Sequence, residues 1–231
     1  MRLKIVTYNV HKCRGLDGRT SAERIAAVLA EIGADVAALQ EVLDDQAEAI
    51  SASLGMPFAM GENRKHRGHG YGNVVLSRFP LAGKRNYDLS VAGREARGCL
   101  RADLDVAGEV LHVFNVHLGT ALIERRRQGR KLIAPELLAD AEIQAPRIVL
   151  GDFNEWTTGL ATRLLRSHMQ SADVRAHLRR SRTYPGVLPF LHLDHIYYDD
   201  ALKLKTFRLH RSRKALVASD HLPLVACFEL A

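Results

Sequence analysis

The chain has 231 residues, of which 47% are hydrophobic and 26% are charged. Both fractions are ordinary for a globular domain and argue against the disordered and fibrous classes. No apolar run approaches the ~18–20 residues that a membrane-spanning helix needs. The formal net charge of +7 favours an anionic partner, such as nucleic acid, a phospholipid headgroup or a phosphorylated metabolite, although solubility alone also accounts for it.

The cysteines and the first residues bear on the cellular compartment. Cys13, Cys99 and Cys227 are odd in number and widely spaced, so neither a disulfide scaffold nor a structural zinc site is expected. The opening residues MRLKIVTYNV have too short an apolar core for a signal peptide. We therefore expect a cytoplasmic protein. Because no linker divides the sequence, we also expect a single domain over 1–231, with a monomer as the favoured state.

Strands and helices alternate along the predicted chain. The first part predicts a strand over 3–8, a helix from a Thr20/Glu23 capping box to Gly33, a strand over 36–39 and a helix over 44–54. The middle predicts strands over 73–77, 97–106 and 110–116, and a long basic helix over 121–142. The last part predicts a strand over 147–150, a helix near 158–168, a loop over 171–190, and strands over 193–198 and 224–230. This mixture of crossovers and hairpins predicts an α/β (α+β) fold of two facing sheets with helices outside.

Polar side chains follow several strands at the point where each strand ends. These clusters are Asn9 with His11, Gln40 with Glu41, Asn115 with His117, Asp152 with Asn154, Asp194 with His195, and Asp220 with His221. Strand ends share a rim, so the clusters are expected to converge on one pocket. Oxygen and imidazole donors without thiolates suit Mg²⁺ or Mn²⁺ better than Zn²⁺, and they suit hydrolysis of a phosphate ester. Each cluster alone is equally explained by a turn, a helix cap or a buried histidine.

Seven motifs occur in a specific order: TYNVH, LQEV, GYGNVVLSR, NVHL, GDFN, LDHI and SDHLP. Together they resemble the endonuclease/exonuclease/phosphatase superfamily, which has the DNase I-like fold, over essentially the whole chain. The resemblance implies a four-layer α/β/β/α sandwich with two central mixed sheets. It also implies a divalent-metal-dependent phosphoester hydrolase, with a phosphodiesterase favoured.

The resemblance assigns a role to each motif on the metal side of the site. Glu41 resembles the principal metal ligand, and Asp220 resembles the second metal-side carboxylate. Asn9 resembles the residue that contacts metal-bound water or the phosphate. The implied cofactor is Mg²⁺ or Mn²⁺.

The resemblance also assigns the catalytic side. Asp152 resembles the carboxylate that orients or deprotonates the attacking water, and Asn154 resembles the residue that holds a phosphoryl oxygen. His221 resembles the catalytic histidine, and Asp194 the carboxylate that orients it. Such a pairing fixes the tautomer of the ring and stabilises the imidazolium.

A second histidine and several supporting residues complete the expected site. His117 is expected to pair with a preceding glutamate, for which Glu95 is the candidate, and a bridge from Glu95 to Arg94 or Arg97 is the alternative. The expected substrate-binding or supporting residues are Glu95, Tyr71, Asn73, Arg97, Arg125 and Trp156, with Arg125 and the nearby Gln128 expected to buttress the site.

Two loops have either a functional or a plain structural explanation. The basic loop that contains Arg64, Lys65, His66, Arg67 and His69 either gathers an anionic substrate or is a solvated turn. The apolar residues 188–191 either form a lip that contacts lipid or base, or pack under the pocket.

The branch within the superfamily narrows the substrate only in part. His11, His117 and His195 depart from the apurinic-endonuclease pattern and argue against abasic-site repair. Within the superfamily, the chain resembles a compact bacterial, YbhP-like branch, on the residues His11-Lys12, Asp152 to Trp156 and Arg182 to Pro185. The substrate is left open between nucleic acid and a phospholipid headgroup or small phosphoester. The alternative from another class is a catalytically silent phosphate-binding module, which the full set of site residues argues against.

Overall fold

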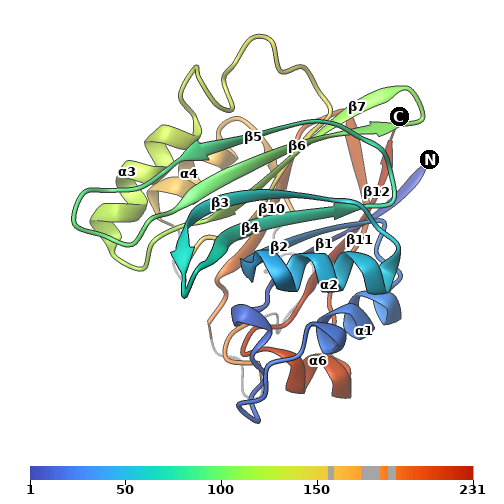
Figure 1. Ribbon diagram of the computed structural model, residues 1–231. Coiled ribbons are helices and arrows are strands. Elements are labelled where there is room, and N and C mark those ends of the chain that lie inside the picture. The colour runs from blue at the N-terminus through green and yellow to red at the C-terminus, as the bar shows by residue number, and fades with distance from the viewer. Residues whose placement is uncertain (156–158, 173–182, 187–190, 231) are drawn as a thin grey trace.

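Two sheets of six strands pack face to face between layers of helices in a computed structural model of the chain (Figure 1). The structure describes residues 1–155, 159–172, 183–186 and 191–230. The first sheet has the strand order β11-β12-β1-β2-β4-β3, and the second has the order β5-β6-β7-β8-β10-β9. Both sheets are mixed, because β1 runs parallel to β2 and β7 runs parallel to β8 while the other pairs are antiparallel. The four-layer sandwich that the resemblance implied is confirmed.

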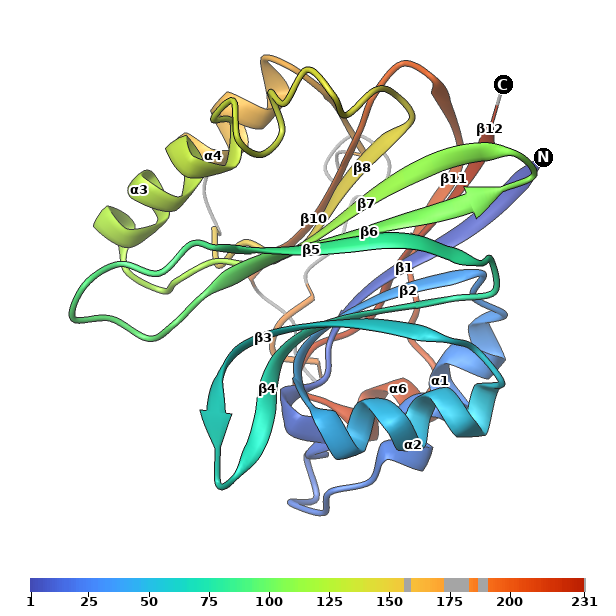
Figure 2. The same ribbon diagram turned by 45° about the horizontal axis from the view of Figure 1, so that its top comes forward.

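The strands of the first sheet are β1 (Arg2–Asn9), β2 (Val36–Leu43), β3 (Phe58–His66), β4 (His69–Ser77), β11 (Leu202–Leu209) and β12 (Leu224–Leu230). Those of the second are β5 (Leu81–Asp88), β6 (Gly98–Val106), β7 (Glu109–His117), β8 (Arg147–Asp152), β9 (Gln170–Ser171) and β10 (Asp194–Tyr198). The helices are α1 (Ala22–Ile32), α2 (Asp44–Leu54), α3 (Leu122–Leu132), α4 (Leu160–Arg166) and α6 (Arg213–Ala218), with a 3-10 turn, η1, at His11–Cys13. In Figure 2, α1, α2 and α6 lie outside the first sheet, and α3 and α4 lie outside the second.

Alternation along the strands divides the core into layers. Leu3 and Ile5 of β1 belong to the cluster between the sheets, whereas Val6 and Tyr8 pack under the helices of the first sheet. Since successive side chains of a strand point to opposite faces, one strand feeds both layers. In the second sheet, Phe114 of β7 likewise packs toward the α3 and α4 side. The inner face of each sheet therefore forms a shared core, which holds the two sheets in a fixed relation.

Two predicted helices differ from the observed ones at their ends. The first helix is capped by Ser21, whose side chain accepts from the Arg24 amide, so the cap lies one residue beyond the predicted Thr20. The predicted helix over 121–142 ends as α3 at Leu132, and Pro135 follows soon after. A proline disfavours helical geometry in the residue before it and cannot donate a backbone hydrogen bond. No helix within the described residues is long and apolar enough to cross a membrane.

Four strands and one helix are absent from the sequence-based prediction: β3, β5, β9, β11 and α6. All four strands lie at the edges of the sheets; β9 has only two residues, whereas β3, β5 and β11 carry many charged residues and are partly or largely exposed. Charged edge strands hinder pairing with other chains but lack the apolar alternation that reveals a strand in a sequence. The predicted strand over 73–77 is correct at its end but begins earlier, at His69.

Candidate active site

The inner faces of four strands change from apolar to polar at the same end of the sandwich. In β1, Leu3 and Ile5 are followed on the same face by Asn9, and in β8, Ile148 and Leu150 are followed by Asp152. The strand registers place these ends together, since the parallel pair β7–β8 aligns His117 with Asp152, and β10 aligns Asp194 with Asp152. The strand ends that were expected to converge do so around Asp152.

Asp152 connects the two sheets. Its Oδ2 atom accepts a hydrogen bond from the Asn9 side-chain amide at 3.0 Å. The same oxygen lies 3.7 Å from the Nε2 atoms of both His117 and His221. Because Asp152 is 2% exposed, these interactions take place away from bulk water, where electrostatic effects are strong.

Glu41 reaches the site through an irregularity in β2. The pairing of β2 with β4 shifts register between Leu39 and Val42, and Glu41 has φ of +59°. A bulge of this kind re-aims a side chain, and a positive φ is rare for a residue with a Cβ atom. The Glu41 carboxylate consequently lies 3.4 Å from the Asn9 amide and 3.1 Å from the Lys12 ammonium.

His221 is fixed by a buried carboxylate. Its Nδ1 atom lies 3.0 Å from Oδ2 of Asp194, which is fully buried. Ser219 steadies the same loop, because its hydroxyl donates to the Asn9 carbonyl at 2.8 Å. Burial alone would lower the pKa of His221, but the carboxylates of Asp194 and Asp152 raise it to about 10. The imidazole is therefore protonated at neutral pH, and Nε2 carries a proton directed toward Asp152.

His117 is the neutral counterpart of His221. Burial, with the Arg97 guanidinium beside it, lowers the pKa of His117 to about 4. Its Nδ1 lies 3.4 Å from Arg97, and Glu95 forms its ion pairs with Arg97 and Arg64 at 2.9 and 2.7 Å. Glu95 thus follows the alternative in which it bridges to Arg97, and Arg97 rather than Glu95 contacts His117. Two histidines with pKa values displaced in opposite directions are typical of acid–base sites.

Lys12 and His11, near the N-terminus, lie beside the carboxylates of Glu41 and Asp220. The Lys12 ammonium pairs with Glu41, and Nδ1 of His11 lies 3.0 Å from Oδ2 of Asp220. For Glu41, burial favours the neutral acid, but the neighbouring His117 and Lys12 lower the pKa to about 2. Burial also opposes ionisation of Asp220, yet the hydrogen bond from His11 and the charge of His221 leave its pKa below the usual value. Both carboxylates are therefore ionised.

Asn154 and Arg125 organise the loop beyond β7. The Asn154 backbone amide donates to Oδ1 of Asp152 at 2.9 Å, and its side-chain amide donates to the Leu118 carbonyl at 2.9 Å. Arg125 donates to the carbonyls of Gly119 and Thr120, and the Gly119 amide donates to Gln128 at 2.8 Å. Arg125 and Gln128 thus support the loop, as expected.

Other predicted residues lie beneath or beside the pocket. Tyr71 is buried under the Arg64 guanidinium, which stacks 4.3 Å from the ring centroid. The Asn73 side chain donates to the carbonyls of Gly98 and Asn115 and so joins the two sheets rather than facing the pocket. Three parts of the sequence prediction lie outside the described residues: Trp156, Arg182 and residues 188–190.

A buried polar network lies under the site; its residues Gln40 and Asn115 were predicted as members of the polar clusters at the strand ends, but their hydrogen bonds to each other were not predicted. The Gln40 amide donates to Asn115 Oδ1 at 2.7 Å, and the Asn115 amide donates to the carbonyls of Leu39 and Val74. Gln40 and Asn115 are fully buried, so the network links the first sheet to the second where the pocket begins. The signal was available: both side chains continue the inner face of a strand that is otherwise apolar.

Residues 6–221 match the model of the endonuclease/exonuclease/phosphatase family. The chain belongs to this family. The uncharacterized protein YbhP of Escherichia coli (strain K12) is 31% identical to it, over 96% of this chain and 94% of that one. The fold is similar to that of the mannosyl-6-phosphatase Bt3783 of Bacteroides thetaiotaomicron, with a TM-score of 0.79, 18% identity and 99% of each chain covered. It is equally similar to D. rerio TDP2 in complex with a single-strand DNA product, with a TM-score of 0.79, 18% identity and 99% of each chain covered.

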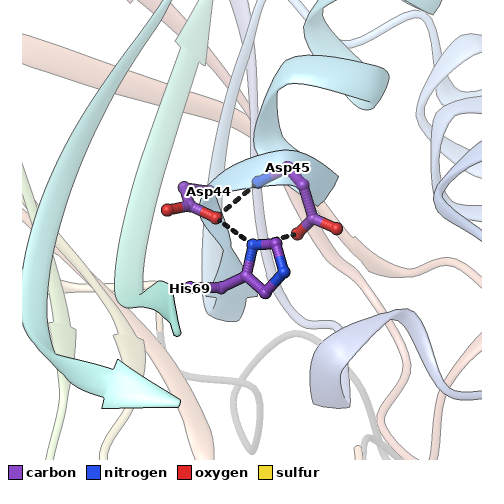
Figure 3. A group of neighbouring side chains, drawn as sticks. All are labelled: Asp44, Asp45 and His69. Carbon is purple, nitrogen blue, oxygen red and sulfur yellow. Dashed lines mark hydrogen bonds and ion pairs between the residues drawn. The ribbon is translucent and has the colours of Figure 1, made fainter. Parts of the chain in front are cut away.

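The described part of this family member contains two groups of side chains able to hold a metal ion. The buried group is Asp152, Asp194 and His221, whose ligand atoms lie within 4.8 Å of one another. The other group is Asp44, Asp45 and His69, shown in Figure 3, where the imidazole lies between the two carboxylates. This second group is largely exposed, and its two carboxylates occupy the first turn of α2, where negative charge stabilises a helix.

Proposed function

We propose that the protein is a divalent-metal-dependent phosphoester hydrolase, with a phosphodiesterase favoured over a phosphomonoesterase. One observation carries the proposal: the Asp152 carboxylate meets the Asn9 amide and both His117 and His221 where the two sheets come together. A carboxylate in that position is suited to orient a water molecule, and the surrounding donors are suited to the charge on phosphoryl oxygens.

Glu41, Asp220 and Asn9 would hold the metal ion. Their donors are carboxylate and amide oxygens, which suit Mg²⁺ or Mn²⁺. Both carboxylates are ionised; the Lys12 ammonium lies beside Glu41, and Nδ1 of His11 lies beside Asp220. This corner of the site therefore attracts positive charge, as a metal site must. A bound Mg²⁺ supplies stabilisation of the charge that develops on the phosphoryl oxygens.

The other side chains of the site have separate roles in the proposed reaction. Asp152 orients the attacking water and accepts its proton. His221, held protonated by Asp194, donates from Nε2 to a phosphoryl or leaving-group oxygen. Asn154 has a further amide hydrogen for a phosphoryl oxygen besides the one given to the Leu118 carbonyl. The Asp194–His221 pair keeps the correct nitrogen directed at the substrate, as in other His/Asp sites.

The substrate is an anionic phosphoester, either nucleic acid or a phospholipid headgroup. The net charge of +7 supports such a partner. The two similar structures name a sugar phosphatase and a protein bound to a DNA product, so they support phosphate chemistry without choosing between substrates.

³¹P NMR with Mg²⁺ tests the proposal directly. The protein is incubated with a mixture of short duplex DNA, anionic phospholipid micelles and an inositol phosphate. We expect one resonance to be consumed by the wild type and by His168→Ala, a control at an exposed histidine, but not by His221→Ala. If no resonance changes with Mg²⁺ or Mn²⁺, the hydrolase proposal fails and the silent phosphate-binding module is favoured.

A further inference from the structure

A second cleft lies beside the candidate active site. Its volume is about 630 Å³, and its lining includes Lys12, Arg14, His66, Arg67, His69 and Asp45. Three of these side chains are permanently cationic at neutral pH and one is anionic, so the cleft carries net positive charge before either histidine is counted. Burial lowers the pKa of His66, and the nearby positive charges of Arg64 and Arg67 lower it further.

Two of the cations are free to receive a ligand. Within the described residues, neither Arg14 nor Arg67 forms an ion pair, and both are exposed. Two neighbouring cations on strand β3 already form ion pairs: Arg64 pairs with Glu95, and Lys65 pairs with Glu62. Positive charge without a counter-charge is therefore concentrated on the wall of the cleft.

The β3–β4 turn presents Arg67 in an unusual conformation. His66 pairs with His69 across the hairpin, and the two residues between them, Arg67 and Gly68, have φ of +52° and +91°. A two-residue turn with both φ values positive favours asparagine followed by glycine. Arginine at the first of these positions accepts backbone strain while supplying a long cationic side chain to the cleft.

On the other side of the cleft, the β3–β4 hairpin is hydrogen-bonded to the first residue of helix α2. His69 lies 2.9 Å from the Asp44 carboxylate (Figure 3). The Gly70 amide donates to the same carboxylate at 2.7 Å. Asp44 begins α2, and its neighbour Asp45 lines the cleft. The cluster of Asp44, Asp45 and His69 thus fixes the wall that carries Arg67.

Lys12 connects this cleft with the candidate active site. It lines the cleft, and its ammonium lies 3.1 Å from the Glu41 carboxylate. Lys12 has φ of +56° in the η1 turn, which follows directly from the site strand β1. One ligand can therefore reach both regions.

We propose that this cleft is a second anion subsite, which binds a further phosphate group of the same substrate while its scissile phosphate lies at Asp152. The inference rests on the proposed hydrolase function and narrows it to substrates with at least two phosphate groups. Arg14 and Arg67 make the direct contacts with the second phosphate, and guanidinium groups suit phosphate because they donate two hydrogen bonds side by side.

Paired substrates that differ by one phosphate test the subsite. The nucleotide pair is thymidine 5′-(p-nitrophenyl phosphate) with and without a 3′-phosphate, and the lipid pair is phosphatidylinositol 4-phosphate and phosphatidylinositol in detergent micelles. For at least one pair, we expect the extra phosphate to raise kcat/KM about tenfold or more, chiefly through KM. In the double variant Arg14→Ala, Arg67→Ala, that advantage falls to less than threefold.

The matched control removes two cations at the opposite edge of the first sheet. Lys203→Ala, Arg208→Ala makes the same change in net charge on β11 and keeps the advantage of the wild type. The pair that shows the advantage identifies the source of the second phosphate. If the enzyme turns over substrates of both pairs but the advantage is absent, or survives in the Arg14/Arg67 variant, the subsite is refuted while the hydrolase stands.

A binding measurement separates the subsite from the chemistry. Tripolyphosphate is titrated calorimetrically into metal-free protein, where no turnover occurs. We expect the Arg14/Arg67 variant to bind about tenfold more weakly than the wild type and the Lys203/Arg208 control. If the Arg14/Arg67 variant binds more weakly but the wild type hydrolyses none of the test substrates, the anion subsite is supported and the hydrolase proposal is contradicted. If all three proteins bind tripolyphosphate equally, the subsite is refuted.

Discussion

Replacing Asp194 by asparagine tests how the site holds its charged histidine. The Asp194 carboxylate is fully buried and lies 3.0 Å from Nδ1 of His221. Asparagine has almost the same shape and still accepts a hydrogen bond, but it carries no negative charge. The variant therefore removes the electrostatic support of the imidazolium and leaves the packing nearly intact.

The expected effect on stability depends on pH. Burial alone lowers the pKa of His221, but Asp194 and the other carboxylates raise it from 6.5 to about 10. The folded protein then binds this proton more tightly than the unfolded chain does. The resulting stabilisation is complete below pH 6.5 and is lost as the pH rises toward 10. It amounts to roughly 5 kcal/mol at low pH, of which roughly 3 kcal/mol is lost between pH 6 and pH 9.

In the Asp194→Asn variant, burial dominates and the imidazole is neutral over most of this range. The variant loses free energy of unfolding relative to the wild type. We expect this loss to be roughly 3 kcal/mol larger at pH 6 than at pH 9. Urea unfolding of both proteins at the two pH values, with EDTA present, measures the difference.

Asp199→Asn is the matched control for this measurement. Asp199 is also buried, but it accepts hydrogen bonds from Arg147, at 2.8 Å from the backbone amide and 3.2 Å from the side chain. This pair contains no imidazole, so the loss of stability in this control is expected to be the same at both values. If Asp194→Asn behaves like this control, Asp194 does not hold His221 in the protonated state and the electrostatic reasoning is refuted.

Three further predictions concern catalysis, metal binding and the connection between the sheets. Asp152→Ala is expected to lower kcat by ~10²–10⁴-fold on whichever substrate the NMR experiment identifies, and steady-state kinetics measures this. Glu41→Ala is expected to raise the Mg²⁺ concentration needed for half-maximal activity at least tenfold, and an unchanged Mg²⁺ titration would contradict the ligand assignment. Asn115→Ala leaves the buried carbonyls of Leu39 and Val74 without their donor, so thermal unfolding is expected to show a loss of roughly 2–4 kcal/mol. A loss below about 0.5 kcal/mol would show that the network between the sheets is not structural.

The sequence predicted which polar residues come together at the candidate site more completely than it predicted the individual strands. Asn9 and Asp152 were found because a polar residue on the inner face of an apolar strand is conspicuous within a few positions. The charged edge strands β3, β5 and β11 were not found, because they are stabilised by pairing with a neighbour that the local sequence does not show. Their positions depend on tertiary contacts rather than on local preference.

Contacts within the site were predicted less well than its members. The family resemblance suggested that Glu95 pairs with His117, but Arg97 lies between them in the structure. Residue spacing places side chains on a face and cannot decide which of two neighbouring cations a carboxylate selects. The same limit applies to Lys12, whose pairing with Glu41 depends on a bulge and a turn that both require positive φ values.

Backbone strain and buried charge occur together at this end of the sandwich. Of the seven non-glycine residues with positive φ within the described chain, five lie at or beside the site: His11, Lys12, Cys13, Glu41 and Asn154. Each such residue costs about 1 kcal/mol or more, and each buried carboxylate needs a nearby cation to remain ionised. The Lys12 ammonium provides that charge for Glu41, and the imidazolium of His221 provides it for Asp194 and Asp220. The core between the sheets carries no such cost, because it is apolar and regular. Most of this strain therefore gathers at the polar ends of the inner strands, beside a cluster of buried charged groups, which is the distribution expected when a stable scaffold supports a preorganised reactive site.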